Sequence, residues 1–351
     1  MLERIDWIDA VKGLCLLLVV IAHLWHPCPE WTHLLTGGYM QVFFVMAGIT
    51  SIHSIRSFQE QMISKSKRLL LPYAFYGVLL LVFGGILPKH IDVGNALLGL
   101  LYGRYTIFPP SAETNFPLLQ ACSYLSPLWF LPCIFFSYVL MAWHDLSKRS
   151  YLIVLWALCV GVATPLLPIL LPWSLEMAFA GFLLMLCGRG MRRLLLDQPA
   201  LLGKPFPLLL LWLGSAVVYM TAWKLDGPVN MSLSIMGAEN MLFPFRIIFF
   251  GLLGLSEALF LSLLFRTLKG TMVTRVFAYV GRHALRLLCI HLFIGECVYF
   301  LLTDRLPQPI SFTCALTVIF LTDFLLEHFF SLITKSISRQ KTTSDVPTEK
   351  H

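Results

Sequence analysis

Long runs of apolar residues, separated by short polar segments, extend from near the start of the chain to about residue 334. Each run has close to the ~20 residues that a helix needs to cross the hydrocarbon of a bilayer. The runs are continuous, whereas the strands of a membrane barrel alternate in hydrophobicity, so we expect an all-α, polytopic transmembrane helix bundle. About ten spans are predicted, at residues 8–26, 37–55, 69–88, 127–143, 151–171, 173–188, 206–224, 243–265, 277–302 and 310–334.

The composition supports a membrane protein. The 351 residues are 58% hydrophobic and only 13% charged, and the mean hydropathy is +0.77. Soluble domains carry nearly twice that charged fraction, which excludes an ordinary soluble enzyme. We therefore predict a transmembrane domain over residues 1–334, followed by a polar, disordered cytoplasmic tail at 335–351.

The distribution of Lys and Arg predicts the orientation. If the N-terminus is cytoplasmic, 18 of the 26 basic residues lie on inner segments, 4 lie on outer segments and the remainder lie within spans. This bias favours cytoplasmic positions for both termini and a multi-pass protein of the cell inner (plasma) membrane. The net charge of +7 then reflects topology, so the expected partner is the lipid bilayer and not a nucleic acid.

The longest outer segment, residues 89–126, contains a short apolar stretch from Val93 to Tyr102. A helix over the membrane face is expected there, either as a functional lid or as a plain connection. Cys28 and Cys122 lie on predicted outer loops, where a disulfide between them is chemically possible. No cysteine spacing typical of a metal site occurs, so no metal is predicted.

Lys12 and His23 are the most informative polar residues, because both fall within the first apolar run. In a continuous helix, eleven residues rise about 16 Å and turn about 20° past three full turns, so the two side chains share a face. Ionisable side chains are costly in hydrocarbon, so such a pair is a functional-site hypothesis by default.

Five segments, in order along the chain, resemble the motifs of one family. They are Asp6–Gly13 with the Lys12-to-His23 spacing, Phe43–Gly48, Lys65–Tyr73, Leu128–Leu131, and Gly281–His291. In this order they are similar to the acyltransferase-3 family, integral-membrane O-acyltransferases that typically modify sugars of bacterial surface glycans. The opening most resembles the fucose-4-O-acetylase-like branch. The chain departs from the family pattern at Lys12, Ala47, Ala284, Arg286 and Leu288.

The resemblance implies transfer of an acetyl or other acyl group to a hydroxyl of a cell-surface or lipid-linked sugar. Acetyl-CoA is then the donor substrate, and no bound cofactor is expected. His23, near the outer end of its span, is the candidate general base, because imidazole exchanges protons near neutral pH; the alternative is a packed, structural histidine. Lys12, near the inner end, either contacts the donor or pairs with Asp9 one turn earlier.

Four further residues are candidates for substrate binding, each with a structural alternative. Lys65 and Arg68 either hold coenzyme A phosphates or contribute only to the positive-inside signal. Trp129 is either a substrate platform or interfacial packing. His291 is either a second site residue or a hydrogen-bonded structural residue.

Two rival interpretations remain at the level of sequence. Charges within the membrane and about ten spans are also typical of a transporter or flippase for a glycan or a small molecule. The departures at Ala47, Ala284 and Arg286 also fit an inactive relative that acts as an assembly partner.

Overall fold

The structure is a computed structural model, and it is predominantly helical in the part of the chain that it describes. The chain divides into two compact units, residues 1–284 and residues 285–351, and each is considered by itself. No strand occurs among the described residues, which are 4–25, 37–51, 57–86, 92–104, 123–163, 169–197, 205–226, 243–302 and 305–344. The predicted all-α class is confirmed. Cys28 and Cys122 lie outside these residues.

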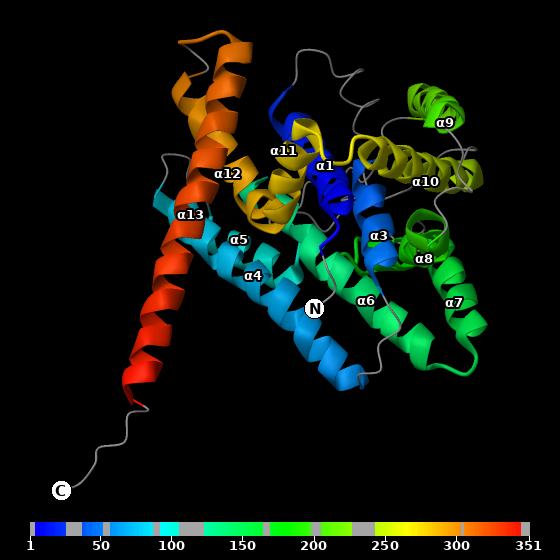
Figure 1. The fold of residues 1–351 in the computed structure, drawn as a ribbon, viewed down its shortest axis with the longest axis horizontal. Helices are drawn as coiled ribbons and strands as arrows, with labels where there is room; N and C mark the ends of the chain where they lie inside the picture. The colour runs from blue at the N-terminus through cyan, green and yellow to red at the C-terminus, as the bar shows by residue number, and fades with distance from the viewer. Residues whose placement is uncertain are drawn as a thin grey trace, which may run out of the picture. The chain divides into compact units, whose positions relative to one another are not determined.

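The described residues form twelve α-helices (Figure 1). The first unit holds α1 (Asp6–Leu24), α3 (Tyr39–Thr50), α4 (Phe58–Ile86), α5 (Val93–Tyr102), α6 (Phe130–Leu146), α7 (Ser150–Ala163), α8 (Leu175–Arg192), α9 (Pro205–Asp226), α10 (Phe243–Thr267) and α11 (Met272–Arg282). Short 3₁₀ turns precede α6 and α8, at Ser123–Trp129 and Pro172–Ser174. The second unit holds α12 (Ala284–Leu302) and α13 (Gln308–Ser344).

Seven helical segments among the described residues are long and apolar enough to cross a membrane. They are Asp6–Leu24, Phe58–Gly84, Ser126–Leu146, Pro172–Leu196, Phe250–Thr267, Ala284–Leu302 and Gln308–Leu332. The other three predicted spans contain α3, α7 and α9, whose apolar stretches are shorter. The chain is therefore a multi-pass helical membrane protein, and every predicted span contains a helix.

The predicted span at 277–302 is wrong in one respect, because the structure breaks it into two helices at His283. Helix α11 starts earlier, at Met272, where the Thr271 side chain accepts the backbone N–H of Thr274 at 3.3 Å. This is an N-cap, which satisfies a backbone donor that the helix leaves free. The charged and aromatic residues of α11 make it amphipathic, unlike the apolar α12 that follows.

Helix α4 begins eleven residues before the predicted span at 69–88, so Lys65 and Arg68 lie on a helix and not in a loop. The start is a capping box: Glu60 accepts hydrogen bonds from the backbone and hydroxyl of Ser57, both at 3.0 Å, and the Ser57 hydroxyl accepts the Glu60 N–H at 3.3 Å. Pro72 lies within α4 without ending it, as is common in membrane helices.

The C-terminal helix α13 continues to Ser344. Residues 335–344 are therefore helical, where the polar composition predicted a disordered tail from residue 335. The remaining residues, 345–351, lie outside the described part of the chain.

Glycines set the closest helix contacts in the first unit, where α1 lies between α11 and α3 (Figure 1). A methyl group on Gly48 of α3 would collide with the Met185 carbonyl of α8, and one on Gly188 of α8 would collide with the Val45 carbonyl of α3. Small residues let helix backbones approach where lipid supplies no hydrophobic driving force.

Candidate active site

Helix α1 carries the first two candidate residues and is uninterrupted from Asp6 to Leu24. Lys12 lies in its second turn and His23 in its last, and both side chains are half-buried. Because the helix is regular, the predicted register holds, with both residues on one face about 16 Å apart along the axis. The structure therefore places them at opposite ends of one helix face, too far apart for direct contact.

Lys12 forms an ion pair within its own helix. Its ammonium lies 3.8 Å from Asp9 Oδ1, one turn earlier. The other oxygen of Asp9 is buried without a hydrogen-bond partner among the described residues. A buried carboxylate is costly without a compensating charge. Lys12 therefore stabilises Asp9, whether or not it also contacts the donor.

Lys65 and Arg68 of α4 lie beside Tyr138 of α6. The Lys65 ammonium is 3.4 Å from the centroid of the Tyr138 ring, which is the geometry of a cation–π contact. Arg68 is exposed, and its charge lies near enough to act electrostatically on Lys65, Tyr138 and Lys12. Arg68 thus lies within electrostatic range of two other sequence-predicted cations, Lys65 and Lys12, of which Lys12 is also paired with Asp9.

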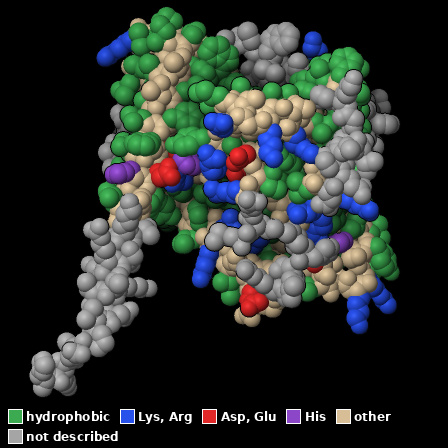
Figure 2. Space-filling view, in the orientation of Figure 1, with side chains coloured by type: hydrophobic (Ala, Val, Ile, Leu, Met, Phe, Trp, Pro, Cys, Tyr) green, Lys and Arg blue, Asp and Glu red, His purple; other side chains and the backbone are tan. Residues whose placement is uncertain are grey.

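Basic side chains are numerous on the face of the first unit seen in Figure 2, where blue surface recurs across the middle of the unit. A basic side chain also lies against the opening motif of the chain. The Arg266 guanidinium of α10 is 6.0 Å from the centroid of the Trp7 ring. Arg266 also donates to the Leu195 carbonyl. Such a field favours an anionic ligand at the end of the bundle predicted to be cytoplasmic.

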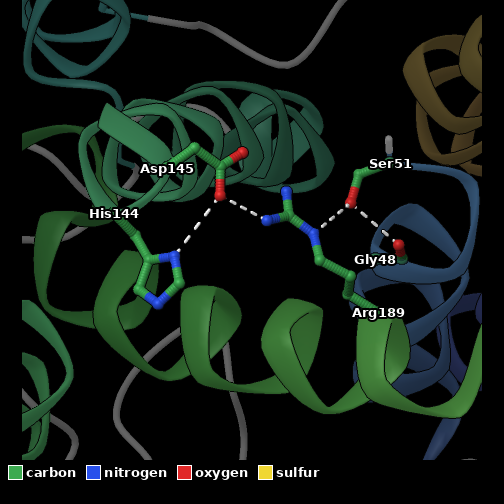
Figure 3. Close-up of polar contacts among 5 residues, drawn as sticks. All are labelled: Gly48, Ser51, His144, Asp145 and Arg189. Carbon is green, nitrogen blue, oxygen red and sulfur yellow. Dashed lines mark hydrogen bonds and ion pairs between the residues drawn. The ribbon is translucent and has the colours of Figure 1, made fainter. Parts of the chain in front are cut away.

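A polar network missed by the sequence analysis joins the C-terminal ends of α3, α6 and α8 (Figure 3). Arg189 donates from Nη1 to Asp145 Oδ1 and from Nε to the Ser51 hydroxyl, the latter at 3.2 Å. Ser51 donates to the Gly48 carbonyl at 2.8 Å, and His144 Nδ1 lies 3.3 Å from the same Asp145 oxygen.

Arg192, one turn after Arg189, strengthens the same junction. It donates to the Ile49 carbonyl of α3 at 2.7 Å. Cations are favourable at helix C-termini, where backbone carbonyls lack partners within the helix. In the sequence both arginines are only part of the positive-inside charge, and nothing local identifies Asp145 as the partner of Arg189 or the Ile49 carbonyl as the acceptor for Arg192.

Trp129 is buried, with 6% of its surface exposed. Its ring lies edge-on to Phe130 at 6.0 Å, and Phe130 in turn contacts Phe43 and Phe44 at 5.6 and 5.3 Å. Two motifs that are distant in the sequence therefore form one aromatic cluster between α3 and α6. This environment favours the packing role of Trp129 over that of a substrate platform.

The first and last sequence motifs also meet within the first unit. Gly281 of α11 lies against the Asp9 carbonyl and 3.0 Å from the Gly13 nitrogen, measured from the position of a methyl group on Gly281. Arg282 lies 3.8 Å from Asp6. The C-terminal motif therefore supports the helix turn that presents Lys12.

His291 belongs to the second unit, in α12, and is fully buried. Its Nδ1 lies 2.9 Å from the Leu288 carbonyl and 3.2 Å from the Leu287 carbonyl, both in the preceding turn. These contacts fix the orientation of the ring within its own helix, and the role of His291 as a site residue stays a prediction. In the same unit, Arg286 of α12 holds Asp323 and Glu327 of α13 at 2.8 and 3.3 Å.

Comparison with protein families gives a match over nearly the whole chain. The acyltransferase-3 model, described as an acyltransferase domain, matches residues 5–326. Comparison with curated proteins gave no match, and neither did comparison with solved structures.

Proposed function

Because the chain belongs to the acyltransferase-3 family and is a multi-pass membrane acyltransferase, we propose that it transfers an acetyl group from acetyl-CoA to a sugar hydroxyl. The acceptor is a cell-surface or lipid-linked sugar, and the membrane is the inner (plasma) membrane. The observation that carries the proposal is the unbroken α1, which holds Lys12 and His23 on one face. The family match favours group transfer over the transporter interpretation.

The donor enters from the side where the cations cluster. Coenzyme A is a polyanion, and Arg68 lies within electrostatic range of both Lys65 and Lys12 at the predicted cytoplasmic end. Charge-assisted hydrogen bonds to phosphate are among the stronger polar contacts available to such side chains. The thioester then extends along α1 towards His23.

The transfer step uses the imidazole of His23 as the base. His23 takes the proton of the acceptor hydroxyl as the oxygen attacks the thioester carbonyl carbon. The carbon–sulfur bond breaks, coenzyme A leaves as a thiolate, and the imidazolium proton returns to that sulfur. The products are the sugar ester and coenzyme A, and direct transfer of this kind needs no further reactant.

The test is the release of coenzyme A from acetyl-CoA by protein reconstituted in lipid nanodiscs, with a glycan acceptor extract. His23→Ala is expected to insert and fold normally but to lose at least about 100-fold in rate, the contribution typical of a general base. The matched control is His328→Ala, which changes an exposed histidine of α13. A full rate in His23→Ala would remove His23 from the mechanism, and substrate flux without coenzyme A release would favour a transporter.

A further inference from the structure

An apolar groove lies where α5 meets the turn before α8. Its volume is about 530 Å³, in the range of small-molecule sites. It is lined by Leu98, Leu101 and Tyr102 of α5, Phe136 of α6, Trp173 of the turn and Leu175 of α8. By the predicted topology, α5 and this turn lie on the outer side, the side of the His23 end of α1.

Trp173 in this groove has a strained backbone. Its φ and ψ are 58° and 25°, and those of Ser174 are 52° and 40°, so two successive residues other than glycine occupy the left-handed region. Such a backbone conformation is strained for residues with a side chain, and it persists only where the surroundings enforce it. Strained residues of this kind cluster at ligand-binding sites, so the conformation of Trp173 indicates a role in binding.

Three contacts hold the Trp173 indole in place. Its Nε1 donates to the Leu101 carbonyl at 2.7 Å, and its ring lies 5.6 Å from that of Phe136. On a third side lies Gly103, where an added methyl group would come within 2.6 Å of Trp173 Cδ1. The side chain nevertheless keeps 39% of its surface exposed. The indole thus has contacts on three sides and remains accessible on the fourth.

Polar groups directly follow Trp173 along the chain. Glu176 forms an ion pair with Arg104, and each residue is 4% exposed. Arg104 also donates to the Leu171 carbonyl at 2.8 Å. The Ser174 hydroxyl is fully buried and has no hydrogen-bond partner among the described residues. A buried hydroxyl without a partner is uncommon and calls for an explanation.

We propose that this groove holds the acceptor, with the hydrocarbon chain of a lipid-linked sugar along α5 and the sugar ring against Trp173. The inference rests on the proposed function and names its acceptor as lipid-linked. The negative face of an indole attracts the C–H groups of a sugar ring. A phospholipid chain would fill the apolar part of the groove, but it would make no use of an indole that is held in a strained conformation and left open.

The experiment uses the full chain in nanodiscs and two photoreactive probes with the same diazirine-bearing alkyl chain. One probe has a glucose headgroup and the other has a phosphocholine headgroup. We expect the glucoside to label the 92–104 and 169–175 segments at least tenfold more than the phosphocholine probe does. Excess unlabelled octyl glucoside is expected to compete.

Two variants make the result specific. Trp173→Ala is expected to abolish the preference for the glucoside. Leu98→Trp, which adds bulk at an exposed helix position that lines the groove, is expected to reduce labelling by both probes at least tenfold. The control is Trp156→Ala, which removes an exposed tryptophan of α7 outside the groove lining and should label as wild type.

Equal labelling by the two probes would overturn the proposal and leave a non-selective lipid crevice. Labelling concentrated on other segments would overturn it as well. The assay needs no acetyl-CoA, so its outcome is separate from that of the proposed function: His23→Ala should lose coenzyme A release while its labelling stays unchanged.

Discussion

Gly281 of α11 lies directly against the backbone of Asp9 in α1, and a single added methyl group would collide with the Asp9 carbonyl oxygen. The contact is reciprocal in the next turn, where a methyl group on Gly13 would collide with the Phe277 carbonyl and lie 2.8 Å from the Gly281 nitrogen. The two helices therefore touch backbone to backbone at the turn that carries Lys12. This places the C-terminal motif of the family in support of the N-terminal one.

Gly281→Ala should destabilise the protein, because the clash is with main chain and not with the flexible end of a side chain. Overpacking of this kind costs about 1–3 kcal/mol, occasionally more. Thermal unfolding in detergent measures it. The matched control is Gly190→Ala in α8, where an added methyl group meets nothing within 4 Å. An equal melting temperature for Gly281→Ala and wild type would contradict the close packing of α1 on α11.

Lys12→Met should lower the melting temperature, because it leaves the partly buried Asp9 carboxylate without its ion-pair partner. Adding Asp9→Asn should restore most of the loss, since the amide carries no charge. Coenzyme A release should stay low in the double variant if Lys12 also contacts the donor. Recovery of both stability and activity would show that Lys12 acts only through Asp9.

Lys65→Gln and Arg68→Gln should each raise the KM for acetyl-CoA about tenfold, because loss of one charge-assisted hydrogen bond costs about 1.5 kcal/mol or more. Lys67→Gln is the control, as it removes a neighbouring exposed charge outside the Lys65–Tyr138 contact. The KM of each variant is measured from initial rates over a range of acetyl-CoA concentrations. The same change in all three variants would indicate a general charge effect instead of a phosphate site.

Asp145→Asn and Arg189→Gln should each destabilise the fold by about 1–3 kcal/mol, since each strands the other side chain in a largely buried position. The double variant should lose less than the sum of the two, which is the sign of a direct interaction. Thermal unfolding of all three variants forms the cycle, with exposed Arg193→Gln as the neutral control. Strict additivity would argue that the network of Figure 3 contributes no coupling.

The sequence predicted the candidate site best where the reasoning was local. Lys12 and His23 share a helix, so their relative placement follows from the residue spacing alone. The helix Val93–Tyr102 was predicted with the bounds that the structure shows. By contrast, the single span at 277–302 was wrong, because a running measure of hydrophobicity does not register the break at His283.

The sequence by itself determined the membrane class, the helical segments and the register of Lys12 and His23, because hydrophobic run length and helix periodicity are properties of neighbouring residues. Only the tertiary structure decided which segments meet: Gly281 with Asp9, Trp129 and Phe130 with Phe43 and Phe44, and Arg189 with Asp145. The physical reason is that these contacts join residues far apart in the chain. A count of positive charges indicates the side of the membrane on which an arginine lies, whereas its partner depends on how the helices pack.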